Sequence, residues 1–286
     1  MGSVENAILK TLAYSDCFNY PLSFKQIWQY LISDKTIKKK DIVDVLKKSK
    51  KVEKKDEYYF LKGKKEVVER RKEREKISIR KQLVARRFAG ILSTIPTVNF
   101  IGISGSLAVH NASEIDDIDF FIISSPGTVW VTRFLSTSLL FLIGGKRKRV
   151  GKNHKNKICL NMYMDRLQIA LPLKDRNLYT AHEIVQLQSV VNKNNTYELF
   201  LKENAWVLKY MPNSFNPKIL NLLVEVNSSF TFLLPFETIA KRIQLWYMRK
   251  HLTSETVSDS YIAFHPRDMT EKVLNSYANK SRSYIL

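Results

Sequence analysis

The sequence predicts an α+β fold, and three observations support this assignment. Two short runs rich in apolar residues, Val98–Ile103 and Asp117–Ser124, are separated by a polar segment, which is typical of neighbouring buried strands. Apolar side chains occur at helical spacing in the first 96 residues and again from about residue 178. A chain of 286 residues is long enough for more than one domain. We therefore expect an N-terminal domain at 1–63, a linking helix at 64–96, a core at 97–177 and a helical region at 178–286.

The N-terminal domain has the pattern of three helices followed by a hairpin. The helices are expected at Val4–Tyr14, at Ser23–Ile32, where Ser23 is a suitable N-cap, and at Lys38–Lys50. Lys51–Leu61 then has a polar turn between two short strand-like runs. In its order of elements this module resembles a winged helix-turn-helix domain.

The chain is strongly basic. Its formal net charge is +20, with a sequence pI near 9.8, and residues 1–96 contain 24 Lys/Arg against 12 Asp/Glu. A second basic cluster lies at Lys146–Arg149. Such patches are typical of nucleic-acid-binding proteins, because Lys and Arg neutralise phosphates. The N-terminal module and the Lys146–Arg149 loop are therefore candidate nucleic-acid surfaces, and a lysine-rich solvated surface is the alternative.

The segment Ile103–Ser124 is the most informative about function. A Gly105-Ser106 turn follows the first strand, and the second strand carries Asp117 and Asp119. Side chains alternate between the faces of a strand, so the two carboxylates should project side by side. Like charges held together repel, which favours a bound cation. Carboxylate oxygens suit Mg²⁺ that is also bound by phosphates.

Gly105-Ser106, a spacer of ten residues and Asp117-Ile118-Asp119 together resemble the signature of the DNA-polymerase-β-like nucleotidyltransferases. The resemblance implies a small mixed sheet flanked by helices and a nucleoside triphosphate whose phosphates lie at Gly105 and Ser106. It also implies Mg²⁺ bound by Asp117 and Asp119, and transfer of a nucleoside monophosphate with release of pyrophosphate. The phosphate position agrees with the affinity of a helix N-terminus for anions.

The same resemblance requires a third carboxylate on a neighbouring strand, and the sequence departs from it there. Lys157–Pro172 is expected to form a hairpin, with a turn at Asp165-Arg166 and a return strand. The residue between apolar neighbours inside the first strand is Asn161, which can offer a carbonyl oxygen to a metal but cannot act as a general base. Either Asp165 or Glu114 supplies the carboxylate, or the site binds nucleotide with little or no turnover.

The rest of the chain suggests packing rather than chemistry. Cys17 and Cys159 are far apart in the sequence and lie among apolar residues, so buried free thiols are expected. The most apolar run, Phe134–Ile143, is too short to span a membrane and is expected to lie in a buried helix that starts near Pro126-Gly127. We expect a cytoplasmic protein. C-terminal helices are expected at Tyr179–Ile184, Tyr197–Tyr210, Ile219–Val226 and Thr238–His251.

Functions of different classes are consistent with these features. The first is a Mg²⁺-dependent nucleotidyltransferase acting on an unidentified hydroxyl, with Asp117 and Asp119 in catalysis and Asn161 or Asp165 in the third position. The alternative is a DNA-binding regulator whose degenerate transferase domain senses nucleotide. A protein-binding role is a third alternative, which capture of a partner would test.

Overall fold

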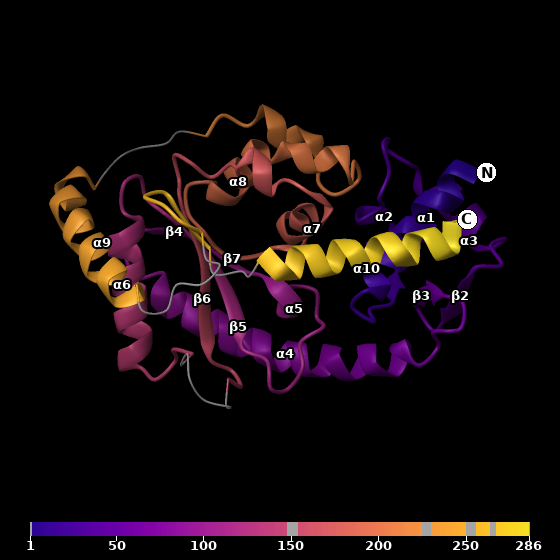
Figure 1. Cartoon of the computed structure of the whole chain (residues 1–286), viewed down its shortest axis with the longest axis horizontal. Coiled ribbons are helices and arrows are strands. Elements are labelled where there is room, and N and C mark those ends of the chain that lie inside the picture. The colour runs from indigo at the N-terminus through magenta and orange to yellow at the C-terminus, as the bar shows by residue number, and fades with distance from the viewer. Residues whose placement is uncertain (1, 148–153, 225–229, 250–255, 264–266, 286) are drawn as a thin grey trace.

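A six-stranded mixed sheet forms the centre of the molecule, and a smaller N-terminal module with its own three-stranded sheet lies at one end (Figure 1). The computed structural model describes residues 2–147, 154–224, 230–249, 256–263 and 267–285. The α+β architecture expected from the sequence, a mixed sheet with flanking helices, is confirmed. No helix within these ranges is long and apolar enough to cross a membrane.

The N-terminal module contains three helices and a hairpin in the order that the sequence predicts. Ser23 caps the second helix: its side chain accepts a hydrogen bond from the Gln26 N–H, and the Gln26 side chain accepts one from the Ser23 N–H. A separate apolar core forms around Ile8, Leu12 and Ile27. The elements are α1 (Gly2–Asp16), β1 (Leu22–Ser23), α2 (Phe24–Gln29), α3 (Lys39–Leu46), β2 (Val52–Lys55) and β3 (Tyr58–Leu61).

The central sheet combines antiparallel and parallel pairing. β4 runs antiparallel to both β5 and β7, whereas β5 and β6 are parallel and are joined by a crossover through α6, as a parallel pair requires. The spatial order is β7-β4-β5-β6-β9-β8. The strands are β4 (Val98–Ile103), β5 (Ile118–Ser124), β6 (Ile158–Asp165), β7 (Gln188–Asn192), β8 (Thr256–Val257) and β9 (Tyr261–Ala263).

The expected linking helix is present as α4, and further helices surround the sheet. α4 is the long charged helix that joins the module to the core, and α10 returns from the sheet to the module (Figure 1). The α-helices are α4 (Val67–Leu92), α5 (Gly105–Ala108), α6 (Val129–Leu142), α7 (Leu178–Gln186), α8 (Thr196–Glu203), α9 (Leu234–Met248) and α10 (Arg267–Ile285). Short 3₁₀ helices occur at Leu173–Asp175, Ala205–Lys209, Pro217–Asn221 and Thr231–Leu233.

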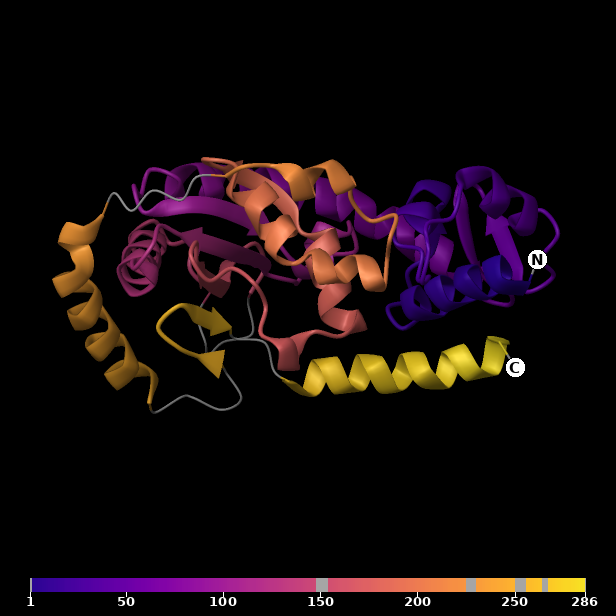
Figure 2. The same ribbon diagram turned by 90° about the horizontal axis from the view of Figure 1, so that it is seen from above.

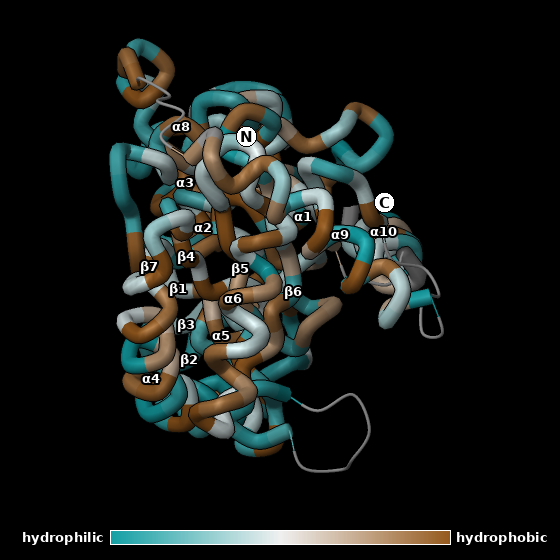
Figure 3. Tube along the Cα trace, turned by 90° about the vertical axis from the view of Figure 1, so that its left-hand side faces the viewer, coloured by the Kyte–Doolittle hydropathy of each residue, from teal (hydrophilic) through white to brown (hydrophobic). Residues whose placement is uncertain are grey.

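Both faces of the sheet are covered, so its strands are apolar on both sides. Ile118 and Phe120 pack on the face covered by α4, α6 and α9. Phe121 and Ile123 pack on the opposite face, under α7 and α8. Figure 3 shows hydrophobic stretches along the strands of the central sheet. Asp119 has the parity of Phe121, and its carboxylate therefore lies on the α7 side of the sheet.

Several predictions about secondary structure are wrong. Leu167–Leu171 forms no return strand, because the edge of β6 that such a strand would need pairs with β9. The C-terminal region is not wholly helical, since β7, β8 and β9 come from it and join the central sheet. Tyr197–Tyr210 divides into α8 and a 3₁₀ helix, and the described part of the helix expected at Ile219–Val226 is helical only up to Asn221, as the end of a 3₁₀ helix. Lys148, Arg149, Val226 and His251 lie outside the described residues.

Burial is lower than expected at two places. The helix predicted at Phe134–Ile143 is present as the second half of α6, but Phe141 and Leu142 at its end are 73% and 79% exposed. Cys17 and Cys159 are free thiols, as expected, yet each is only partly buried. The apolar end of α6 therefore reaches the surface of the described structure.

The N-terminal module contacts the core through aromatic and polar groups. α10 lies alongside the module and packs on α1 (Figure 2). Tyr14 of α1 stacks on His182 of α7, with ring centroids 3.7 Å apart. Buried Arg71 of α4 lies 3.9 Å from the ring centroid of Tyr20 and donates a hydrogen bond of 3.2 Å to the Val109 carbonyl, just beyond α5. The module is thereby joined to the same part of the chain that carries the Gly105-Ser106 turn.

The buried His182 predicts a pH-dependent stability. Burial lowers the pKa of His182 to about 4 from an ordinary value of 6.5, so the folded state holds the ring neutral while the unfolded chain protonates it more readily. The stability contributed by the neutral ring is complete above pH 6.5 and is lost as the pH falls toward 4.

Urea unfolding at several pH values tests this expectation against His182→Phe, which keeps an aromatic ring without a titrating group. Between pH 7 and pH 5 the free energy of unfolding should fall by about 2 kcal/mol more in the unmodified protein than in the variant. Parallel losses in the two proteins would show that His182 titrates normally in the folded state.

Candidate functional site

The chain turns sharply at the end of β4 and brings Gly105 against Asp119. Gly105 has a φ of +65°, a left-handed backbone conformation that favours glycine. A Cβ atom at this position would lie 3.0 Å from Oδ2 of Asp119, so a side chain would also crowd the carboxylate. The Ser104 N–H donates a 3.0 Å hydrogen bond to the Asp119 carbonyl and fixes the alignment of the two strands. The Gly105-Ser106 turn and the second aspartate therefore share one site.

Three side chains of metal-ligand type gather beside this turn. The Asp117 and Asp119 carboxylates and the Cys159 thiol each offer an atom, and these atoms all lie within 4.8 Å of one another. The parallel register of β5 and β6 sets Asp119 opposite Cys159. The two aspartates expected from the sequence are thus adjacent, and Cys159, which the sequence suggested only as a buried thiol, lies beside them.

The structure does not place Asp165 in this cluster. Asp165 lies at the opposite end of β6, where its carboxylate accepts hydrogen bonds from the backbone N–H of Gly127 at 2.6 Å and of Leu167 at 2.8 Å. It therefore stabilises a turn. Asn161 is buried, two residues beyond Cys159, at a shift in the β5–β6 register. This β-bulge interrupts the alternation of side chains between the two faces of β6. The sequence-based positions of Asn161 and Asp165 had assumed that this alternation is regular.

The loop before β5 explains the positions of Ser106 and Glu114. The Ser106 hydroxyl donates to Asp116 over 3.3 Å, and the same carboxylate accepts the Ser113 N–H at 2.8 Å. Glu114 is exposed and forms an ion pair with Lys155 at 2.7 Å. Ser106 therefore belongs to the turn, whereas Glu114 is engaged at the surface and is not part of the Asp117, Asp119 and Cys159 cluster.

Burial and repulsion make the cluster receptive to positive charge. Burial, and then the charge of Asp117, raise the pKa of Asp119 to about 7. Burial and the two aspartates also raise the pKa of the Cys159 thiol, which stays protonated at neutral pH. The Arg147 guanidinium lies 2.7 Å from Asp117 Oδ2 and 3.5 Å from Cys159 Sγ. This single cation compensates part of the negative charge.

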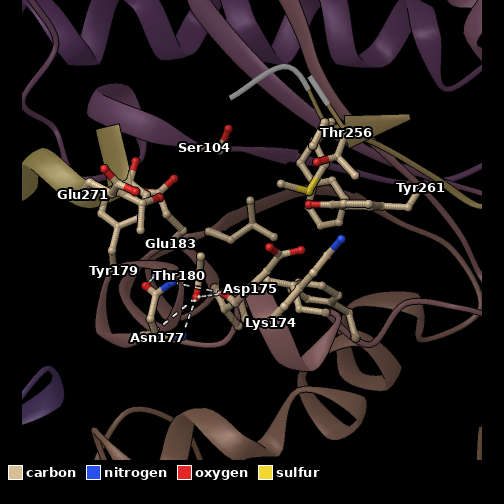
Figure 4. A pocket seen from close by; sticks show the side chains of 18 residues that line it. Ser104, Lys174, Asp175, Asn177, Tyr179, Thr180, Glu183, Thr256, Tyr261 and Glu271 are labelled. Atoms are coloured by element: carbon tan, nitrogen blue, oxygen red, sulfur yellow. Dashed lines mark hydrogen bonds between the residues drawn. The ribbon is translucent and has the colours of Figure 1, made fainter. Parts of the chain in front are cut away.

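Helix α7 adds two residues that the sequence did not single out. Burial, and then the charge of Asp119, raise the pKa of Glu183 to about 7. The charge of Glu183, burial and the charge of Asp119 raise the pKa of Tyr179, one helical turn away. Both side chains line a cavity of about 370 Å³ (Figure 4). Helical periodicity predicts α7 itself, but no sequence signal indicates that this face lies near β5.

The donor set fits Mg²⁺ in part. Asp117 and Asp119 provide the hard carboxylate oxygens that Mg²⁺ takes, and this ion commonly completes its coordination with water and substrate phosphates. A protonated thiol is a poor ligand for it. The two aspartates therefore suit Mg²⁺ held jointly with a phosphate, and Cys159 does not supply a third oxygen.

Gly105→Ala should disturb the site more than it disturbs the fold. A left-handed alanine costs about 1 kcal/mol of stability, and its Cβ would lie 3.0 Å from the Asp119 carboxylate. Gly63→Ala is a matched control, because Gly63 has a φ of +85° and nothing lies within 4 Å of a Cβ there. Both variants should lose similar stability in urea. Only Gly105→Ala should bind a non-hydrolysable Mg²⁺–triphosphate more weakly in calorimetry, and equal affinities would contradict this geometry.

Comparison with known proteins does not assign the site. No family model matches the chain, and comparisons with curated proteins and with solved structures found no significant match. The function of the site must therefore be inferred from its own residues and their geometry.

Proposed function

We propose that this protein is a Mg²⁺-dependent nucleotidyltransferase, which moves a nucleoside monophosphate from a triphosphate to a hydroxyl group. One observation carries the proposal: the Gly105 turn lies directly against Asp119, beside a second carboxylate, Asp117. These are the two halves of the sequence pattern that resembles polymerase-β-like nucleotidyltransferases. Their meeting at one point of the sheet supports a shared site for phosphates and a divalent ion.

Each part of the site has a role in this reaction. Asp117 and Asp119 hold Mg²⁺, and the backbone at Gly105 and Ser106 holds the phosphates. The ion, when bound, neutralises phosphate charge and supports in-line displacement. The acceptor oxygen forms a bond to the α-phosphorus, and the bond from that phosphorus to the oxygen bridging to the β-phosphate breaks. Pyrophosphate leaves, and the hydroxyl proton passes to a carboxylate of the site or to water.

Arg147 suits the same ligand. Its guanidinium is 40% exposed and already reaches Asp117. With Mg²⁺ bound at the two aspartates, Arg147 would no longer be needed to neutralise Asp117 and could bind a phosphate oxygen, which its planar group of N–H donors fits well. Without ligands, Arg147 therefore supplies to Asp117 the positive charge that Mg²⁺ would supply when it binds with the triphosphate.

A second function, nucleotide-dependent regulation of nucleic-acid binding, has its own support. Arg147 neutralises Asp117 without a metal, and a thiol, that of Cys159, rather than a third carboxylate lies beside the two aspartates. Such a site can bind a nucleotide and turn it over poorly. α3 and the segments beside it, including the hairpin, also present exposed lysines suited to phosphates. These are Lys38, Lys39, Lys40, Lys47, Lys48, Lys50, Lys51 and Lys54.

Asp119→Asn should abolish transfer, whereas Asp165→Asn should not. Loss of the Asp119 charge removes a metal ligand, so release of pyrophosphate from Mg²⁺–triphosphate should fall by about 100-fold or more. Asp165→Asn makes the same chemical change on the same sheet, but that carboxylate only accepts backbone hydrogen bonds. It should cost about 1–2 kcal/mol of stability and preserve activity. Equal activity of the unmodified protein and Asp119→Asn would exclude the proposed reaction at this site.

Cys159→Asp separates the two functions. It sets a third carboxylate opposite Asp119 in the β5–β6 register, so in a transferase pyrophosphate release should rise by about tenfold or more. Cys159→Ser, which adds no charge, is the control and should leave the rate unchanged. A regulator would show no increase in pyrophosphate release in either variant, while a triphosphate analogue would still change DNA affinity in fluorescence anisotropy.

A further inference from the structure

The cavity beside α7 has an electrostatic character opposite to that of the whole chain. It encloses about 370 Å³, a size suited to a small organic molecule. Its described lining includes the acidic side chains Asp175, Glu183 and Glu271 against one basic side chain, Lys174. The chain as a whole has a formal net charge of +20. An acidic cavity in so basic a protein favours a cationic ligand and disfavours a polynucleotide.

The acidic groups reach this cavity from three separate elements. Glu183 comes from α7, Asp175 from the 3₁₀ helix before it and Glu271 from α10. Glu183 and Glu271 lie with Tyr179 at one end of the space, and Lys174 and Asp175 lie away from them (Figure 4). Among the described residues, none of these three acids forms an ion pair. Their carboxyl groups are therefore available to a cation in the cavity.

The remaining walls are mostly apolar. Phe121 and Met162 come from β5 and β6, Leu187 follows α7, Phe200 comes from α8 and Tyr261 from β9. Aromatic and aliphatic walls of this kind bury a ring or a hydrocarbon chain. The ligand that complements the whole cavity is thus a cation with an apolar body.

The cavity adjoins the proposed transfer site. Ser104, one of its wall residues, immediately precedes Gly105 and donates its N–H to the Asp119 carbonyl. Phe121, another wall residue, follows Asp119 on the same face of β5. Glu183 lies close enough to Asp119 for the two charges to interact. A molecule that fills the cavity therefore lies next to the segments that carry Gly105 and Asp119.

We propose that this cavity is the acceptor site, and that it takes a small organic cation carrying a hydroxyl group and an apolar ring or chain. The acceptor role rests on the proposed transferase function. The ammonium group lies between Glu183 and Glu271, the apolar body packs on Phe121 and Tyr261, and the hydroxyl is directed to the α-phosphate. Its oxygen receives the nucleoside monophosphate with release of pyrophosphate, as described above.

Binding of a fluorescent amino alcohol tests the cavity directly. The probe is 1-(2-naphthyl)-2-(isopropylamino)ethanol, which is cationic at neutral pH, and its N-acetyl derivative keeps the ring and hydroxyl without the charge. The full chain should bind the cation at least about tenfold more tightly than the neutral derivative. The double variant Glu183→Gln, Glu271→Gln should lose this preference. Glu203→Gln, which removes an exposed acid of α8 outside the cavity lining, is the matched control and should retain it.

The outcomes separate the cavity from the transferase reaction. Failure to bind the cation, equal affinity for the two probes, or a preference unchanged in the double variant would overturn the proposal. Label transferred from an α-labelled triphosphate to the bound amino alcohol would support the acceptor role. A cation that binds but receives no label, in a protein that does release pyrophosphate, would overturn that role. If the protein prefers the cation but releases no pyrophosphate under any condition, the proposed transferase function is wrong, although the cavity does bind cations.

Discussion

The antiparallel pairing of β4 with β5 places the Gly105 turn against the Asp119 carboxylate, and the rest of the site depends on this contact. The contact is possible because position 105 has no side chain and adopts a positive φ. The parallel pairing of β5 with β6 then sets Cys159 beside the same carboxylate. α7 covers that face and adds Glu183. Paired strands and a packed helix, rather than a mobile loop, therefore position most of the charged groups.

The charge at the site opposes the charge of the protein. In a chain of net charge +20, the α7 face of the sheet brings together Asp117, Asp119 and Glu183. Burial and mutual repulsion raise the pKa of Asp119 and of Glu183 to about 7. Partly buried like charges reduce stability, and Arg147, which pairs with Asp117 and also acts on Asp119, offsets part of this cost. Carboxyl groups whose pKa is raised by burial and by neighbouring charges are typical of functional sites. It is consistent with a site that gains stability when cationic ligands bind.

The sequence predicts the features of this protein that depend on neighbouring residues. Asp117 lies immediately before β5 and Asp119 is the second residue of that strand, so their proximity follows from local sequence, as the Ser23 cap follows from residues three positions apart. Features that depend on distant pairing are not predictable in this way. The register that selects Cys159, the bulge at Asn161 and the attachment of β7, β8 and β9 are set by contacts between remote segments. The acidic cavity likewise forms only when α7 and α10 meet at the sheet.

In the proposed function, Asp117 and Asp119 bind a divalent ion together with a triphosphate. Electron paramagnetic resonance can count Mn²⁺, used in place of Mg²⁺, bound per chain with and without a non-hydrolysable triphosphate. We expect bound Mn²⁺ to increase with the triphosphate and to be lost in Asp117→Asn, while Asp165→Asn should bind Mn²⁺ as the unmodified protein does. Mn²⁺ binding that is absent, or that is unaffected by Asp117→Asn, would contradict it and would leave Arg147 as the permanent partner of Asp117.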